Sequence, residues 1–194
     1  MIKSIARRWL ANFSQRYHYD TTYMVHLLEQ RLSVFLKFAT LNLLSSQRRG
    51  IPATPWWTAR IRAALWEDCG SCVQLVCNMA IADGIDPDTV TAVVSSNISA
   101  LDEDCVLALQ FTESVLAHDP VADSLREQAR LHWSEDGLIS LAMTISATRV
   151  YPCIKSVLGH RHSCSCIEVA QQAVTPAFFD SATMERNTSA RYPR

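Results

Sequence analysis

The sequence predicts an all-α protein with one helical domain, and three observations support this prediction. Glycine and proline are scarce, with 5 and 7 among 194 residues, while 48% of the residues are hydrophobic. In several stretches the apolar residues recur every three or four positions, which is the period of an α-helix. Neither a low-complexity linker nor an internal repeat divides the chain. We therefore expect one helical domain over residues 1–170 and a flexible C-terminal tail over 171–194.

Each predicted helix has a start or a stop that follows from residue types. In order along the chain, the predicted helices cover 2–16, 21–45, 55–66, 69–83, 87–95, 103–117, 122–133 and 136–158. The first two follow apolar residues at helical spacing, and the second ends where Gly50 and Pro52 interrupt the pattern. Pro55 suits the first turn of the third helix, and Gly84 suits the left-handed turn after the fourth.

The later helices are bounded by capping residues and prolines. Asp86 and Asp102 precede the fifth and sixth helices, where an aspartate side chain can accept a hydrogen bond from the first turn. The sixth helix stops at the His-Asp-Pro sequence of 118–120, and the seventh begins just after it. The last helix should bend or lose regular hydrogen bonding at Pro152 and should end at Gly159.

Charge and hydropathy exclude several classes of protein. The formal net charge is −1 and the basic residues are scattered, so nucleic acid is not expected as a partner. The apolar segment 34–44 contains Lys37 and is shorter than the roughly 20 residues that a membrane helix needs. The pair Arg7 and Arg8 is not followed by the long apolar core of a secretion signal. We expect a soluble, cytoplasmic protein without a membrane partner.

A pair of cysteines at the start of a predicted helix is the strongest functional signal. The chain has seven cysteines, an odd number, which argues against a fully paired secreted framework. Cys69 and Cys72 are three residues apart, so their sulfurs can close a small disulfide ring. Unpaired N–H groups and the positive end of the helix dipole favour a thiolate there. We interpret the pair as a redox dithiol, and Glu67 as a carboxylate close enough to accept a thiol proton.

The residues around this pair resemble the core of the carboxymuconolactone decarboxylase/AhpD-like superfamily. The resemblance covers about residues 55–95 and rests on 64–76, which contains Cys69-Gly70-Ser71-Cys72, and on Met79, Ala80 and Gly84. It implies an AhpD-like helical bundle that forms a homo-oligomer. By the same resemblance Cys72 is the attacking thiol and Cys69 the resolving thiol, with a small hydroperoxide as substrate. The electrons would come from an external thiol reductant or a redox partner protein, and no cofactor is implied.

Two positions of this pattern differ from the superfamily. In the redox branch a histidine follows the second cysteine by four residues, where this chain has Val76, and a relay glutamate stands where this chain has Trp57. Neither residue can move a proton. We therefore expect a substitute base, with Glu67 ranked first and His160 or His162 as alternatives.

A second group of candidate residues follows the last predicted helix. His160, His162, Cys164 and Cys166 alternate along the chain, so an extended segment would place all four on one side. Imidazole and thiolate suit zinc or copper, but ligands spaced so evenly along one strand rarely surround a metal. We expect no metal site, and instead a loop whose histidines are solvated or reach toward the dithiol.

The leading hypothesis is a thiol-dependent oxidoreductase with peroxidase or thiol–disulfide exchange activity. The alternatives are a decarboxylase-like lyase of the same superfamily and a non-catalytic helical protein that binds a partner or a metal. In the oxidoreductase, Cys72 should lie in the first helical turn and be less accessible than Cys69.

Large apolar side chains in 21–66 also predict association between subunits. Phe35, Phe38, Trp56 and Trp57 exceed what one face of a helix pair needs. Exposed apolar patches of this kind mark interfaces. We expect an oligomer whose interface uses part of this segment.

Overall fold

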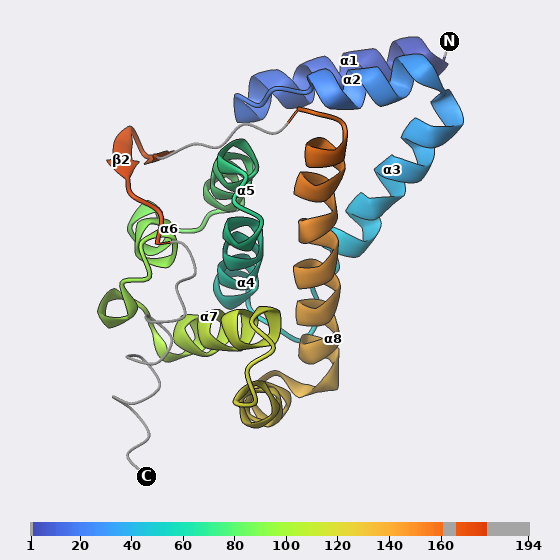
Figure 1. Ribbon diagram of the computed structural model, residues 1–194. Coiled ribbons are helices and arrows are strands. Elements are labelled where there is room, and N and C mark those ends of the chain that lie inside the picture. The colour runs from blue at the N-terminus through green and yellow to red at the C-terminus, as the bar shows by residue number, and fades with distance from the viewer. Residues whose placement is uncertain (1, 161–165, 178–194) are drawn as a thin grey trace.

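The computed structural model describes residues 2–160 and 166–177, and in this part of the chain it is 74% helical, as predicted. A small antiparallel sheet is the only other regular structure in these ranges (Figure 1). The elements are α1 Ile2–Tyr17, α2 Thr22–Gln30, α3 Leu32–Ser45, α4 Ala53–Trp66, α5 Gly70–Ala82, α6 Pro87–Val94, η1 Ile98–Ala100, α7 Glu103–Leu116, α8 Ala122–Val157, β1 Ile167–Val169 and β2 Gln172–Val174.

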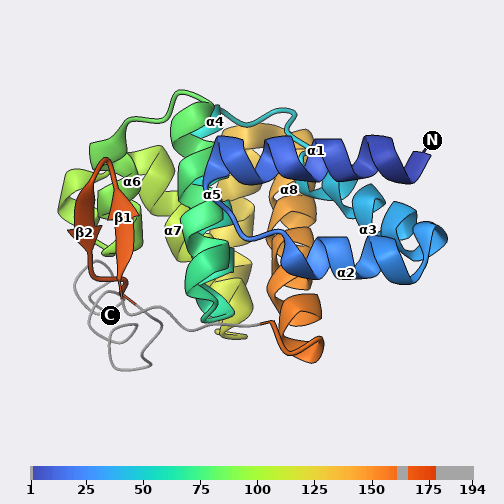
Figure 2. The same ribbon diagram turned by 90° about the horizontal axis from the view of Figure 1, so that it is seen from above.

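Helix α4 is the centre of the main core. Its residues from Pro55 to Leu65 are all buried, so it has no solvent-facing side there. A helix buried all round must be covered by neighbours on several sides, and α5, α6, α7 and α8 pack against it (Figure 2). One buried ion pair lies in this core, between Arg62 of α4 and Glu113 of α7.

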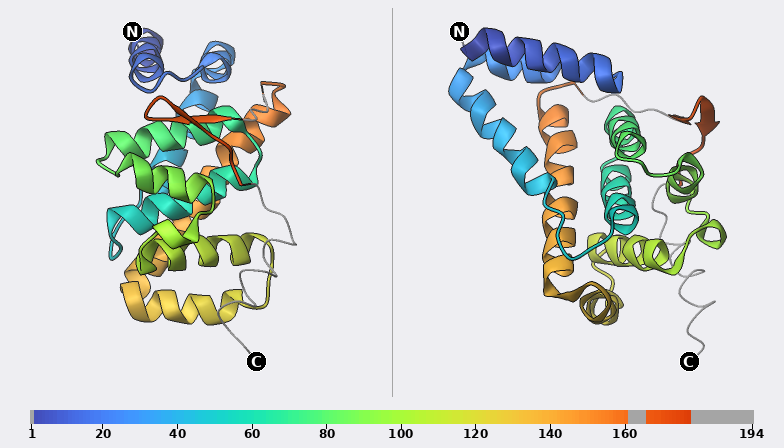
Figure 3. Two further views of the ribbon diagram at one scale, coloured as in Figure 1. Left: turned by 90° about the vertical axis from the view of Figure 1, so that its left-hand side faces the viewer. Right: turned by 180° about the vertical axis from the view of Figure 1, so that it is seen from behind.

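Helices α1, α2 and α3 form an arm at one end of the molecule. Helices α1 and α2 lie side by side, and α3 runs back from them toward α8 (Figure 3). The arm has its own core, made of Leu10, Tyr19, Tyr23, Met24, Leu28 and Phe35. Arg7 on α1 and Glu29 on α2 form an ion pair of 2.8 Å between the two helices.

The predicted helix 21–45 is wrong in one respect, because it is two helices. Arg31 is extended, with φ −161° and ψ 117°, and separates α2 from α3. The break turns the chain so that Tyr23 and Leu28 of α2 and Phe35 of α3 reach the same small core. Apolar residues continue at helical spacing across the break, so the pattern contains no sign of it.

Helix α8 contains the last two predicted helices. Ser134, with φ 61°, is a non-helical residue that separates 122–133 from the rest, where the sequence also placed a break. The helix continues through Pro152, and the left-handed Gly159 follows its end as expected. By length and composition α8 could cross a membrane, but 44% of its most apolar window is buried inside the fold, and a core helix meets the same criteria.

A short hairpin follows the last helix and packs on the main core. Ile167 and Val169 of β1 and Val174 of β2 are buried, while Gln172 and Ala173 are exposed. The structure therefore differs from the prediction of a flexible tail from residue 171, because the described domain extends to 177. The alternation of apolar and polar residues in 167–174 covers too few positions to predict a strand. Residues 178–194 of the predicted tail lie outside the described residues.

Candidate functional site

The two cysteines lie where the sequence placed them, at the start of α5. Cys69 is the N-cap residue and Cys72 is in the first turn, with its N–H bonded to the Cys69 carbonyl at 2.9 Å. Asp68, with φ 45°, makes the tight turn between α4 and α5. The expected order of accessibility was wrong, because Cys69 is 0% exposed and Cys72 is 5% exposed. Cys69 lies under the turn, whereas Cys72 faces a cavity.

The two sulfurs have different proton affinities. A hydrogen bond from the Cys72 thiol lowers the pKa of Cys69 to about 6, against the opposing effect of burial. The Ser71 hydroxyl, the Cys72 N–H and the charge of Lys155 act in the same direction. The pKa of Cys72 is raised, first by its hydrogen bond to Cys69 and then by burial. These effects favour the negative charge of the pair on Cys69 and the remaining proton on Cys72.

A buried lysine lies next to this pair. Lys155, near the end of α8, is 1% exposed, and its Nζ donates to Ser71 Oγ at 2.7 Å. Ser71 Oγ is in turn 3.7 Å from Cys69 Sγ. Within residues 2–160 and 166–177, no carboxylate lies within 4 Å of this ammonium. At longer range the charge of Lys155 lowers the pKa of the Asp20 carboxyl as well as that of Cys69.

Two tyrosines from the arm enclose the lysine and Cys72. Lys155 Nζ lies 4.9 Å from the ring centre of Tyr19 and 5.6 Å from that of Tyr23, within cation–π range. The Tyr19 hydroxyl is 4.0 Å from Cys72 Sγ. Burial raises the pKa of Tyr19, so its hydroxyl keeps its proton and can donate it in a hydrogen bond to sulfur.

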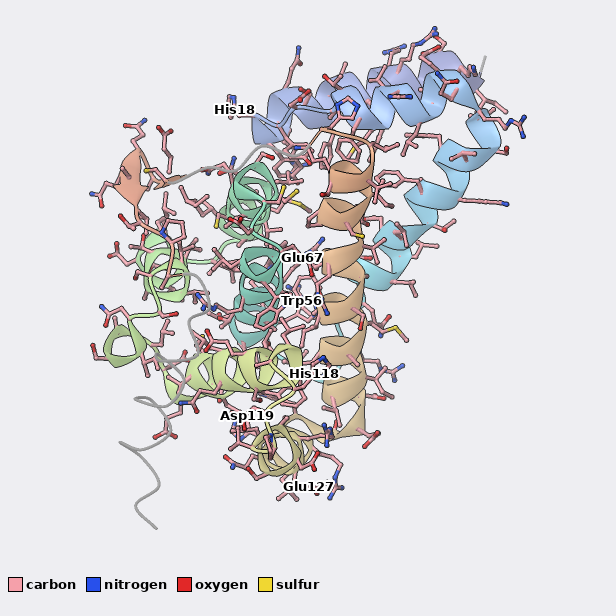
Figure 4. All side chains as sticks on the ribbon, in the orientation of Figure 1. His18, Trp56, Glu67, His118, Asp119 and Glu127 are labelled. Atoms are coloured by element: carbon pink, nitrogen blue, oxygen red, sulfur yellow. The ribbon has the colours of Figure 1, made fainter. Side chains whose placement is uncertain are left out.

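The other predicted site residues are engaged elsewhere. Glu67 Oε1 accepts from Arg149 Nε at 2.5 Å, and Figure 4 shows Glu67 in the space between α4 and α8. The ring of His160 packs edge-on against His26, with 5.8 Å between centres. His162 and Cys164 lie outside the described residues.

The predicted metal ligands include one more described residue. Cys166 Sγ lies 3.9 Å from the Ile167 carbonyl oxygen. In the described ranges no three His, Cys, Asp or Glu side chains are grouped as a metal site requires.

Lys155, Tyr19, Tyr23 and Ser71 were missed by the sequence analysis. Lys155 had a usable signal, because it continues the buried face of α8 at helical spacing from Thr144, Thr148 and Pro152. A lysine on a buried face is rare and needs a reason. Tyr19 and Tyr23 carried no such signal.

Cys72 opens on an apolar cavity of about 410 Å³ between the arm and the helices α4, α5 and α8. Val76 and Met79 of α5 line it beside Cys72. Its polar lining comes from Asn42, Arg60, Thr148 and Tyr151, together with the tyrosines of the arm. A molecule in this cavity could contact Cys72 but not the enclosed Cys69.

Comparisons with known proteins found no match. No family model, no curated protein and no solved structure matches the chain. The resemblance to the AhpD-like superfamily therefore stays a prediction, and what the site can do follows from its own residues.

Four large aromatic residues were expected to form an exposed association patch. Phe35, Trp56 and Trp57 are buried within the chain, and Phe38 is partly buried against the arm's core, so that expectation was wrong. The exposed large apolar side chains of this segment are Val34, Leu36, Leu43 and Leu44, all on α3. An oligomer whose interface uses part of 21–66 stays a prediction.

Proposed function

We propose that Cys69 and Cys72 form a redox dithiol and that the protein is a thiol-dependent oxidoreductase acting on hydroperoxides. The observation that supports this best is Lys155, which is buried beside the thiols with no carboxylate within 4 Å in residues 2–160 and 166–177. A buried cation costs free energy unless a nearby anion compensates it. A Cys69 thiolate is such an anion, reached through the Ser71 hydroxyl.

The two cysteines have different roles in the reaction, because only one of them lines the cavity. Cys72 lines the cavity, so it meets the hydroperoxide and attacks the terminal peroxide oxygen. Cys69 carries the resting negative charge and takes the Cys72 proton as attack begins. This proton transfer within the pair replaces the histidine and glutamate relay, for which the chain has Val76 and Trp57.

The reaction then proceeds in three steps. The Cys72 thiolate takes one oxygen to become a sulfenic acid, the O–O bond breaks, and the leaving alkoxide takes a proton from water. The Cys69 thiol condenses with the sulfenic acid, which forms the disulfide and releases water. An external thiol reductant or redox partner protein then reduces the disulfide and is itself oxidised to a disulfide.

The Lys155 ammonium, through the Ser71 hydroxyl, and the Tyr19 hydroxyl stabilise negative charge on the thiol pair during these steps. Glu67 is not needed as a base in this scheme, because its carboxylate is bound by Arg149. The arrangement therefore ranks Cys69 above both Glu67 and the histidines as the proton acceptor.

Peptide mapping after oxidation tests the proposal. The full-length protein is treated with cumene hydroperoxide, alkylated, digested and analysed by mass spectrometry, with and without dithiothreitol. We expect a reversible Cys69–Cys72 disulfide in the parent and a trappable sulfenic acid at Cys72 in Cys69→Ser. Cys72→Ser should form neither product, and Cys153→Ser, which removes an exposed cysteine on α8, should behave as the parent. Oxidation of Cys153 with Cys69 and Cys72 unchanged would contradict the proposal.

A further inference from the structure

A second buried cation faces the same cavity. Arg60 of α4 is 6% exposed and lines the cavity, and its Nε has no hydrogen-bond partner among the described residues. Its guanidinium lies 5.2 Å from the Trp56 ring centre and 5.0 Å from that of Trp57. Burial lowers the pKa of Arg60 to about 10, so the side chain is still charged at neutral pH.

A second residue of the cavity wall carries a buried polar atom without a partner among the described residues. Thr148 Oγ1 on α8 is buried and has no hydrogen-bond partner in the described structure. Thr148 and Arg60 both line the cavity, from facing helices. Buried donors normally have partners, so two unpartnered groups in one cavity indicate that a ligand supplies the acceptor. A guanidinium and a hydroxyl together match a carboxylate, which accepts several hydrogen bonds.

The rest of the cavity wall is apolar and suits a hydrocarbon chain. Its lining is mostly aliphatic and aromatic, with Trp9 and Phe13 of α1, Phe35 and Phe38 of α3, and Leu75 of α5. A more polar cleft of about 470 Å³ shares Asn42, Arg60 and Met79 with the cavity and is also lined by Arg16 and by the ion pair of Arg48 with Asp83. Because Asp83 balances Arg48, the net positive charge where the cleft meets the cavity comes from Arg60 and Arg16.

We propose that this cavity binds a fatty acid, with its carboxylate on Arg60 and Thr148 and its hydrocarbon chain along the aromatic wall of the arm. A helix from a second copy of the chain could cover the apolar wall but would leave Arg60 without an anion. The charge of Arg60 thus favours a free carboxylate over a protein segment. Binding does not require the thiols, so it is independent of the redox chemistry, although the bound chain lies over Cys72.

Calorimetric titration of the full-length protein tests the proposal. The probes are laurate, its uncharged counterpart dodecanol, and decanoate, all at monomeric concentrations. We expect laurate to bind about tenfold or more tightly than dodecanol, because only the carboxylate pairs with Arg60. Each methylene should contribute about fourfold, so decanoate should bind more weakly than laurate.

Variants and thiol labelling locate the bound acid. Arg60→Met should lose the preference for laurate over dodecanol, whereas Arg130→Met, an exposed arginine of α8 paired with Glu127, should keep it. Laurate should also slow the alkylation of Cys72 but not that of Cys153. If Arg60→Met does not fold, the affinities of the parent protein for laurate and dodecanol still test whether the cavity binds a carboxylate. Equal affinity for the two probes, no binding of either, or a dimer whose cavity excludes laurate would overturn the proposal.

Discussion

Two arginines of α4, Arg60 and Arg62, are both buried but belong to two different regions of the molecule. Residues two apart on a helix point to different sides, so Arg62 faces α7 and Arg60 faces the cavity. Arg62 pairs with Glu113 and donates to the Val93 carbonyl at 3.2 Å, whereas the neighbours of Arg60 are two tryptophan rings. A buried cation that is paired with a carboxylate of the same chain therefore supports the fold, whereas a buried cation without such a carboxylate is available to an external anion.

The cysteines show the same contrast between the two regions. Burial raises the pKa of Cys77 and that of Cys105 to about 12, as expected for thiols in an apolar core. Cys69 is also buried, yet its pKa falls to about 6 because hydrogen-bond donors surround it. Burial alone would have made all three inert.

The largest expected effect is the difference in stability between changes at the two arginines. Arg62→Met removes the partner of the buried Glu113 and should lower the free energy of unfolding by about 3–5 kcal/mol. Among the described residues Arg60→Met removes no ion pair, only two buried cation–π contacts, and it should lower the free energy of unfolding by about 2 kcal/mol. Urea denaturation measures both. Equal losses in the two variants would mean that Arg60 also supports the fold and would remove the contrast.

The next effect is the pH dependence of stability. The folded state loses the Cys69 proton near pH 6, whereas an unfolded thiol keeps it up to about pH 9. Because the unfolded state binds more protons in this window, stability should rise between pH 6 and 9 and be lost again as pH falls through 6. Above pH 9 the sign reverses, since Cys77 and Cys105 keep their protons only when folded.

Urea denaturation at several pH values measures this effect, with Cys69→Ala as the matched variant. The rise from pH 6 to 9 should be absent in Cys69→Ala, and the fall above pH 9 should remain. A parent protein with flat stability from pH 6 to 9 would contradict the assignment of a thiolate to Cys69.

Most of the fold could be predicted because its helix boundaries depend on local chemistry. The side chain of Asp86 accepts from the Thr89 N–H and that of Asp102 from the Cys105 N–H, as their cap positions required. The break at Arg31 could not be predicted, because it depends on how α2 and α3 fold back onto one small core. The hairpin at 167–174 escaped notice because each strand is only three residues long.

Only the part of the site whose residues are close together in the sequence could be predicted. Cys69 and Cys72 could be found from their spacing and from the start of α5. Lys155 reaches Ser71 from 84 residues away along the chain, and no sequence pattern connects the two. Glu67 was ranked first as a base because it is close in sequence, yet the fold pairs it with Arg149.

The smallest effect concerns Lys155, whose positive charge we expect to stabilise the thiolate of Cys69. The first ionisation of the thiol pair can be measured from the ultraviolet absorbance of the thiolate as a function of pH. The absorbance of Cys69→Ser is subtracted from that of the parent at each pH. We expect an apparent pKa near 6 in the parent. It should rise by about one unit in Lys155→Met, in line with loss of a nearby opposite charge, and stay unchanged in Lys37→Met, an exposed lysine of α3. A parent that titrates near 8.5 like a free thiol, or a Lys155→Met variant that titrates like the parent, would contradict the claim that this lysine stabilises the thiolate.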